Sequence, residues 1–223
     1  MKINNEFCMS FSEKTYISLN SSFEKNKEKL TLKELKIIKM QSEEINETIF
    51  GIDLGTSTCL CGRMNETRGL DLVDFGSTQL MPSSVCYTEN KTLVGNEINN
   101  KPNGVISESK ILLSKKYSDE YVQNQINTNS LSYELVKGKQ GEVMIKTSYS
   151  CKSGNNKEVR EKIVHPYEVS SELLKHIKKC TCNKYNLDVN KVVKAVITVP
   201  AYFNNKQRAE TIKAAQLAGI VLL

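Results

Sequence analysis

A short strand-and-turn motif holds the residues best suited to chemistry. Residues 49–54, Ile-Phe-Gly-Ile-Asp-Leu, are mostly apolar and place the carboxylate of Asp53 near the end of an expected strand. Gly55 follows, and a residue without a side chain lets the backbone approach a ligand closely. Successive backbone N–H groups in such a turn form an anion-binding nest. The hydroxyls of Thr56 and Ser57 add donors, so the motif predicts phosphate binding.

The same motif has a place for a metal ion. Asp53 suits a hydrated Mg²⁺, which usually keeps several waters and takes few carboxylates. The turn is not a P-loop, because no Gly-Lys-Ser/Thr follows it. Taken alone, it also fits a plain tight hairpin with an incidental Asp, since short motifs have many false positives.

Cysteine and histidine give weaker signals. The seven cysteines are an odd number and no secretory signal precedes them, which favours reduced thiols in the cytoplasm. Cys59-x-Cys61 and Cys180-x-Cys182 resemble halves of a metal site, but zinc usually takes the spacing C-x₂₋₄-C. The two histidines lie eleven residues apart, and no Cys/His or Ser/His/Asp arrangement is predicted.

Composition excludes several classes of protein. The 223 residues are 39% apolar and 25% charged, which is typical of a globular domain and excludes collagen or low complexity throughout. No run approaches 18 apolar residues, so no membrane span is expected. The net charge of +6 is scattered as single charges and pairs, which gives nucleic-acid binding no specific support.

Hydrophobic patterns predict the strands that position the motif. Residues 48–54 and 59–64 read as a hairpin with a glycine at its tip. A polar, mixed stretch follows between residues 118 and 165, with a loop at 152–157. Further strands are expected at 70–75, 85–87, 92–94, 131–137 and 142–149.

The C-terminal third predicts a helix, a strand and a second helix. Pro166 opens a helix, where its missing N–H costs nothing. The β-branched run within residues 191–200 indicates a strand buried on both faces, as in a parallel sheet. Asn204 is expected to cap a helix that ends before Gly219, and residues 221–223 begin another strand.

The first 48 residues differ from the rest. Residues 1–29 are polar and read as a tail. Thr31 and Glu34 fit a capping box, and an approximate apolar stripe follows to residue 45. The stripe fits a short amphipathic helix resting on the domain or, alternatively, a helix that binds a partner.

Five blocks of sequence resemble one family, the 70-kDa heat-shock chaperones. Gly-Ile-Asp-Leu-Gly-Thr-Ser at 51–57 looks like that family's first phosphate loop. The blocks occur in the family's order and cover 49–223 almost without gaps, whereas residues 1–48 match nothing. The other four are Leu-Val-Gly-Asn at 93–96, Lys-Ile-Leu-Leu-Ser-Lys-Lys-Tyr at 110–117, Pro-Tyr-Glu-Val-Ser-Ser at 166–171, and 195–208 with its Ile-Thr-Val-Pro-Ala-Tyr-Phe-Asn.

The resemblance implies an α/β fold of the actin-like ATPase (ribonuclease-H-like) type, limited to the first lobe. Residues 49–82 and 166–223 would form the core of that lobe. Residues 83–165 would form an inserted mixed α+β subdomain, and residues 1–48 an N-terminal extension.

The resemblance also implies roles for the turn. Asp53 would hold Mg²⁺ through water, and Gly55, Thr56, Ser57 and Thr58 would hold the phosphates of ATP or ADP. The inherited function is ATP binding linked to protein folding.

Pro200 and Arg208 occupy positions that, in the family, relay the nucleotide state toward the substrate domain. Simpler interpretations exist for both. Pro200 ends an apolar run and would terminate a strand, and Arg208 would be a solvated helix residue.

One departure from the family concerns catalysis. The family's catalytic lysine lies four residues after the glycine of its Val-Gly-Asp segment, and Asn99 stands there in this chain. Asn carries no positive charge, so hydrolysis is expected to be impaired on the order of a thousandfold. Lys101 lies two residues further on, and the sequence gives no sign that it takes this role.

A second departure is the end of the chain at Leu223, before the family's second phosphate loop, adenine pocket and peptide-binding domain. A truncated lobe with weak binding of Mg-ATP is therefore expected. The alternatives are a non-enzymatic module that binds co-chaperones, nucleotide-exchange factors or a full-length chaperone, and a degenerate gene fragment without a folded product. We expect a cytoplasmic protein with no nucleic-acid or membrane partner.

Overall fold

The computed structural model describes residues 49–65, 69–99, 104–153 and 156–223. The chain divides into residues 1–47 and 48–223, and every element below belongs to the second unit. The helix expected in 31–45 lies outside the described residues. The main elements are six strands, β1 (Ile49–Leu54), β2 (Thr58–Asn65), β3 (Gly69–Leu72), β4 (Met81–Pro82), β11 (Val193–Thr198) and β12 (Ile220–Leu222), and two helices, α4 (Pro166–Tyr185) and α5 (Asn205–Leu217).

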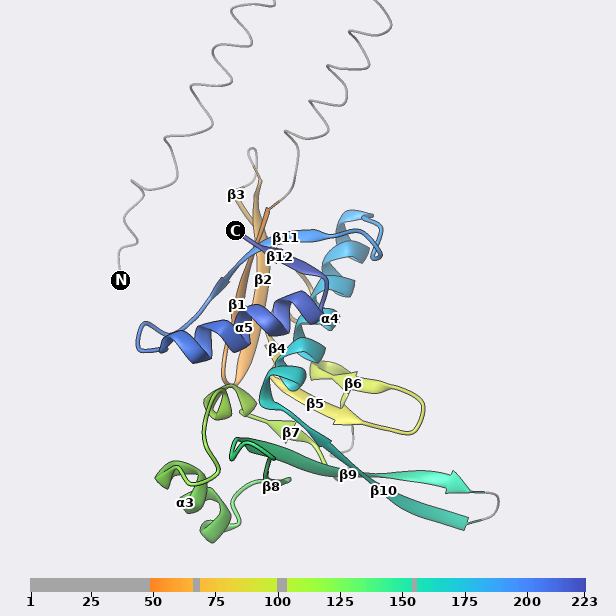
Figure 1. Cartoon of the computed structure of the whole chain (residues 1–223). Helices are drawn as coiled ribbons and strands as arrows, with labels where there is room; N and C mark the ends of the chain where they lie inside the picture. The colour runs from red at the N-terminus through yellow and green to blue at the C-terminus, as the bar shows by residue number, and fades with distance from the viewer. Residues whose placement is uncertain (1–48, 66–68, 100–103, 154–155) are drawn as a thin grey trace, which may run out of the picture. The chain divides into compact units, whose positions relative to one another are not determined.

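These strands form one central sheet in the order β12-β11-β1-β2-β3, and β4 pairs with β2 (Figure 1). β1 pairs in parallel with β11 and antiparallel with β2, and β11 pairs in parallel with β12. The predicted hairpin is therefore confirmed, and the chain is α/β. Because β1 and β11 pair in parallel, the turn after β1 lies beside the end of β11, although the two are far apart in the sequence.

One face of this sheet is covered by helices. Burial alternates along β1, and the side chains of Phe50, Ile52 and Leu54 are all at most 2% exposed. The thiol of Cys61 on β2 lies 3.4 Å from the hydroxyl of Thr181 on α4. α5 packs against α4 and β12 through small residues such as Ala214 and Ala215. The hydrophobic effect of this burial stabilises the sheet.

The other face is open among the described residues. The register places Gly51 beside Val196 and Asp53 beside Thr198 on this face. Val196 is 49% exposed, so the expectation that residues 191–200 are buried on both faces is wrong. The strand is parallel to both of its neighbours as expected, but both described helices that pack on the sheet lie on its other face.

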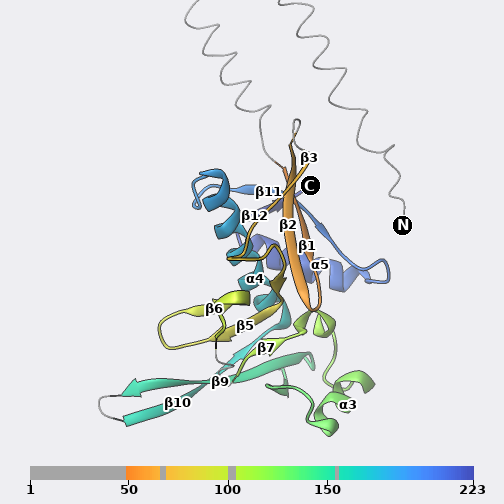
Figure 2. The same ribbon diagram turned by 180° about the vertical axis from the view of Figure 1, so that it is seen from behind.

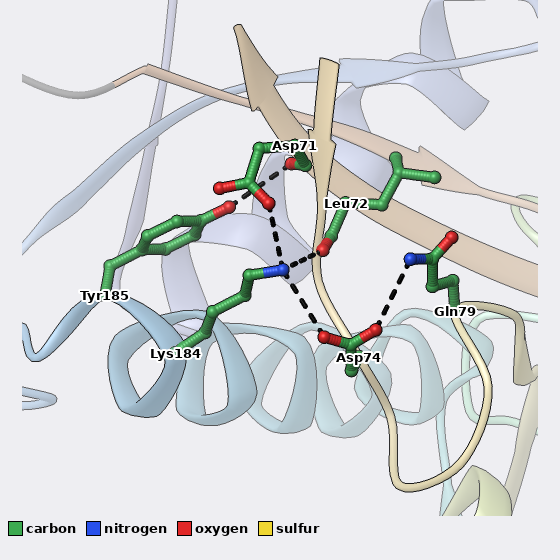
Figure 3. A network of polar contacts seen from close by, with 6 residues as sticks. All are labelled: Asp71, Leu72, Asp74, Gln79, Lys184 and Tyr185. Atoms are coloured by element: carbon green, nitrogen blue, oxygen red, sulfur yellow. Dashed lines mark hydrogen bonds and ion pairs between the residues drawn. The ribbon is translucent and has the colours of Figure 1, made fainter. Parts of the chain in front are cut away.

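A polar network ties α4 to the edge of the sheet (Figure 3). The ammonium of Lys184, in the last turn of α4, lies 2.9 Å from Asp71 and 3.3 Å from Asp74, and it also donates to the carbonyl of Leu72. Tyr185 donates its hydroxyl to the carbonyl of Asp71 at 3.2 Å. The cation of Lys184 lowers the pKa of the Asp71 carboxyl. β3, which ends earlier than the predicted 70–75, is thereby held against the helix.

Residues 83–165 form two smaller sheets, ordered β6-β5-β7 and β10-β9-β8, which lie beside the turn between β1 and β2 in both views (Figures 1 and 2). Their strands are β5 (Ser84–Tyr87), β6 (Thr92–Val94), β7 (Ile106–Ser107), β8 (Glu134–Lys137), β9 (Val143–Ser153) and β10 (Asn156–Val164). They are joined by short 3₁₀ helices, η1 (Gly95–Glu97) and η2 (Ser109–Leu112), and by the helix α3 (Glu120–Thr128).

Three local expectations fail in this region. The loop expected at 152–157 is instead the end of a long hairpin, since β9 reaches Ser153 and β10 begins at Asn156. α3 was not anticipated, because it is only nine residues long and only one of them, Val122, is buried. The family helix that resembles 110–117 is here only the single turn of η2.

Candidate nucleotide-binding site

Asp53 lies at the end of β1 on the open face of the sheet. Its side chain is exposed, and its carboxylate accepts a 2.6 Å hydrogen bond from the hydroxyl of Thr198 at the end of β11. The parallel pairing of β1 with β11 brings these two residues, 145 positions apart, into register. Thr198 thus orients a carboxylate whose remaining lone pairs are available to a ligand or to water.

The carbonyl groups of the turn after Asp53 accept hydrogen bonds from residues elsewhere in the protein, on the side away from solvent. Ser83 donates its hydroxyl to the Gly55 carbonyl at 2.8 Å and its N–H to the Ser57 carbonyl at 2.9 Å. Lys110 donates its ammonium to the carbonyl of Leu54. Three consecutive or near-consecutive carbonyls are therefore bound to buried donors. These contacts fix the shape of the turn from the protein side.

The turn leaves no room for a side chain at position 55, so it requires glycine there. A β-carbon built at Gly55 would lie 2.0 Å from the carbonyl oxygen of Thr58. Gly55 and Thr56 are half-buried, whereas Ser57 and Thr58 are exposed. The five predicted site residues, Asp53, Gly55, Thr56, Ser57 and Thr58, therefore lie together at an accessible turn, which excludes a turn shielded from solvent.

A cavity of about 390 Å³ opens beside this turn. Thr56 and Lys110 line it together with Pro200, Phe203 and Asn204, which belong to the connection from β11 to α5. The predicted relay residue Pro200 is thus brought next to the predicted phosphate loop. The ring of Phe203 supplies an apolar wall, and its centroid lies 5.5 Å from the ammonium of Lys110.

Arg208 lies on α5 and contacts the same connection. Its guanidinium donates to the carbonyl of Phe203 at 3.1 Å and to that of Ala201 at 3.4 Å. Arg208 is exposed on α5, which fits the simpler interpretation of a solvated helix residue, and its guanidinium also holds two carbonyls of the connection. Asn204 caps α5 as predicted, since its side chain accepts from the N–H of Gln207 at 3.0 Å. Arg208 and this cap together define the conformation of the segment behind Pro200.

Asn99 is exposed and follows η1. No described contact joins it to the turn at 55–58. Lys101, the other residue considered for a catalytic charge, lies outside the described residues.

The cysteines and histidines include one arrangement that the sequence did not reveal. The thiol of Cys180 lies 3.4 Å from Nε2 of His176, and Nδ1 of His176 lies 3.9 Å from a carboxylate oxygen of Glu97. Burial raises the pKa of the Cys180 thiol and lowers the pKa of His176, so both groups are favoured in their neutral forms. A reactive thiolate is therefore disfavoured. Among the described residues no cluster of three or more His, Cys, Asp or Glu side chains could hold a metal ion, and six cysteines are free thiols.

The larger cavity of about 700 Å³ lies elsewhere, between the turn joining β8 to β9, the start of α4 and the middle of α5. Its carboxylates are engaged within the protein: Glu210 accepts from the N–H of Ser114 at 2.7 Å, and Glu142 accepts from that of Gln140 at 2.8 Å. Burial raises the pKa of Glu210. None of the residues predicted to bind phosphate lines this cavity.

Sequence reasoning missed three residues of the site, namely Thr198, Ser83 and Lys110. Thr198 and Lys110 do fall within blocks that resemble the heat-shock family, but nothing in their local patterns links them to the turn. Ser83 belongs to none of the five blocks. Each is far in sequence from the residue that it binds: the smallest separation is the 26 positions between Ser83 and Ser57.

Comparison with known proteins gives a consistent result. Residues 49–223 match the family described as "Hsp70 protein". Similar proteins include the chaperone protein DnaK of Carsonella ruddii, 32% identical over 78% of this chain and 27% of the relative, and the chaperone protein HscA of Buchnera aphidicola, 35% identical over 78% of this chain and 26% of the relative. The heat shock cognate HSP70 protein of Trypanosoma brucei brucei is 29% identical over 79% of this chain and 25% of the relative.

The chain spans about a quarter of the length of these relatives. Within the described part of the chain, the helices are too short or too polar to cross a membrane.

Proposed function

The chain belongs to the Hsp70 family, and from that premise we propose that residues 49–223 form the first lobe of an actin-like nucleotide-binding domain that binds ATP or ADP with Mg²⁺. The core would be 49–82 and 166–223, and 83–165 the inserted subdomain. The order β12-β11-β1-β2-β3, with a parallel half and an antiparallel hairpin, supports this reading of the fold. Such a domain would serve ATP-dependent protein folding, because its relatives include proteins named as chaperones.

The observation that carries the proposal is the accessible turn at 55–58, whose carbonyl groups, with that of Leu54, accept hydrogen bonds from buried side chains and a buried N–H. Because the carbonyls of Leu54, Gly55 and Ser57 accept from buried donors, the ligand side of the turn is left to N–H groups and hydroxyls. N–H groups and hydroxyls are the donors that phosphate oxygens need. Gly55 keeps this approach free of side chain.

The residues present also fit the metal ion. The carboxylate of Asp53 is a hard oxygen donor at the edge of the turn, and Thr198 holds its orientation. Mg²⁺ is bound in many phosphate sites by one or two carboxylates with its waters and the phosphates. When bound, the ion would offset the negative charge of the phosphates. Asp53 would hold it through water.

Pro200 and Arg208 are proposed to relay the state of the nucleotide. Pro200 lines the cavity beside Thr56, and Arg208 binds the carbonyls of the segment that follows Pro200. A shift at Thr56 would therefore reach Arg208 through the connection from β11 to α5. The destination of this relay would be a substrate domain or a co-chaperone.

Hydrolysis is proposed to be slow, because Asn99 offers no positive charge where the family places a lysine. The odd number of cysteines and the six free thiols of the described residues support a cytoplasmic location.

Calorimetry with Mg-ATP and Mg-ADP tests this function. We expect binding to the wild-type chain, and at least tenfold weaker binding by Asp53→Asn, which removes the charge that attracts the metal. Asp119→Asn is the matched control, because Asp119 lies in the inserted region outside the turn. The absence of any binding by the folded wild type, or equal affinity of Asp53→Asn and wild type in the presence of Mg²⁺, would overturn the proposal.

A second candidate is a non-enzymatic interaction module, favoured by the apolar side chains on the open face of the sheet. Met64, Leu70 and Val196 are 75%, 62% and 49% exposed. Exposed apolar groups of this size suit a protein partner such as a full-length chaperone. Val196→Asp would then abolish capture by a purified full-length Hsp70 while leaving nucleotide binding intact.

A further inference from the structure

The ammonium of Lys110 is buried at the edge of the candidate phosphate site. Lys110 is only 7% exposed, although lysine is almost never fully buried unless it is paired. Its ammonium carries three N–H donors. Among the described residues one acceptor takes a hydrogen bond from it, the carbonyl of Leu54. Two donors of a desolvated cation are therefore left for a group that the described residues do not supply.

The surroundings of this ammonium favour an anion. Lys110 lines the cavity of about 390 Å³ with Thr56, whose hydroxyl is a further donor. Asn204 and Gln207, at the start of α5, line the same cavity, and the N-terminus of a helix carries a partial positive charge. The face of Phe203 closes one side, 5.5 Å from the ammonium. The polar groups of this cavity are thus mainly donors and positive charges.

One negative group is close, but it does not complete the pairing. The carboxylate of Asp53 interacts electrostatically with Lys110, and this interaction opposes the lowering of the Lys110 pKa that burial causes. Asp53 makes its described hydrogen bond to Thr198 instead. A buried charge without full pairing is costly, and a bound anion would remove much of that cost.

We propose that Lys110 is a phosphate-binding residue: its ammonium, anchored on the Leu54 carbonyl, donates into the cavity beside Thr56 to the phosphoryl oxygens of the nucleotide held at the turn. The inference rests on the proposed nucleotide-binding function and deepens it. The ammonium of Lys110 would hold the shape of the turn through Leu54 and supply its positive charge. A purely structural role, in which Lys110 only anchors Leu54, makes different predictions.

Binding of a graded series of ligands separates the two roles. Wild type, Lys110→Met and Lys110→Arg are titrated with adenosine, Mg-ADP, Mg-ATP and tripolyphosphate by calorimetry. Lys175→Met is the control, because Lys175 lies on α4, is 2.9 Å from Glu172 and does not line this cavity. Thermal melts of every variant establish that it folds.

The expected result is a loss that follows the phosphates. A hydrogen bond to a charged group contributes enough that its loss weakens binding by about tenfold to a hundredfold. Lys110→Met is expected to lose that much affinity for ATP, ADP and tripolyphosphate and none for adenosine, while Lys110→Arg restores most of it. Lys175→Met should change each affinity less than threefold.

Other outcomes would overturn the inference. If wild type binds ATP and Lys110→Met binds it equally well, or loses adenosine and ATP to the same degree, Lys110 is structural and the proposed nucleotide site survives. If folded wild type binds none of the phosphate ligands, both the inference and the proposed function fail.

A measurement on the wild-type chain covers the case in which Lys110→Met does not fold. The ¹⁵Nζ signals of labelled lysines are recorded, and the signal missing from Lys110→Arg is assigned to Lys110. Tripolyphosphate or Mg-ATP is expected to shift this signal at the concentrations that saturate binding. A signal that stays in place under saturation contradicts direct contact.

Discussion

On one face of the central sheet, Phe50, Ile52 and Leu54 are buried beneath helices, whereas on the other face Ile49 and Asp53 of the same strand are exposed. Successive side chains of a strand point to opposite faces, so core and surface alternate residue by residue. The covered face is apolar and supplies stability. The open face carries the carboxylate suited to chemistry and leads into the turn at 55–58. The difference shows that the candidate site is built directly on the core, one residue away from it.

The largest effect should come from the covered face. Ile52→Ala leaves a cavity among residues that are almost fully buried, since Ile52 is 2% exposed. Its free energy of unfolding is expected to fall by about 2–5 kcal/mol. Val196→Ala on the open face is the matched control, with an expected change below about 1 kcal/mol. Urea denaturation followed by circular dichroism measures both. Equal losses would show that the second face is also core.

Substitution of Gly55 in the turn and of Gly51 on the open face compares how each region tolerates a side chain. Gly55→Ala places a β-carbon 2.0 Å from the Thr58 carbonyl oxygen, whereas Gly51→Ala meets nothing nearer than 3.9 Å. We expect Gly55→Ala to cost about 1–3 kcal/mol through overpacking. It should also weaken binding of Mg-ATP at least tenfold. Gly51→Ala should leave both unchanged. Stability and calorimetry on the two variants would sharpen the boundary between the turn and the sheet face.

Two hydrogen bonds are expected to differ in what they stabilise: Ser83 binds the buried side of the turn, and Thr198 binds Asp53 on the open face. Ser83→Ala leaves the Gly55 carbonyl without its buried hydroxyl donor and should cost about 1–2 kcal/mol of stability. Thr198→Val removes the donor to an exposed carboxylate, so its stability should change less. Its affinity for Mg-ATP should fall severalfold, because Asp53 loses its orientation. The reverse pattern would contradict the division of roles between the two residues.

The smallest expected effect is a pH dependence on the covered side. Burial lowers the pKa of His176, and Lys179 acts in the same direction, while Glu97 opposes it. The unfolded chain then binds a proton more readily than the folded chain, so this contribution to stability is full above a pH of about 6.5 and is lost as the pH falls toward the folded pKa. Urea midpoints of wild type and His176→Gln between pH 7.5 and 5 measure it. The variant should show the shallower decline, and an equal decline would assign the effect to other groups.

The sequence predicted local structure best where one signal sufficed. The hairpin at 49–64, the helix from Pro166, the Asn204 cap and the left-handed Gly219 are confirmed, because turn residues and caps act over a few positions. It failed at 152–157, where Lys152 and Ser153 of β9 pair with Lys157 and Asn156 of β10, because strand pairing holds polar residues extended without a local signal. It also failed on Val196, because the run of β-branched residues cannot tell how many faces are covered.

By itself, the sequence determined the turn from Asp53 to Thr58 and membership of the Hsp70 family, since both depend on residue types at short, ordered spacings. Only the tertiary structure decided which distant groups complete that turn. Ser83, Lys110 and Thr198 reach it through sheet pairing and the path of the insertion, which bring together groups up to 145 positions apart. Contacts over such separations depend on how the whole sheet is assembled, and no local pattern encodes them.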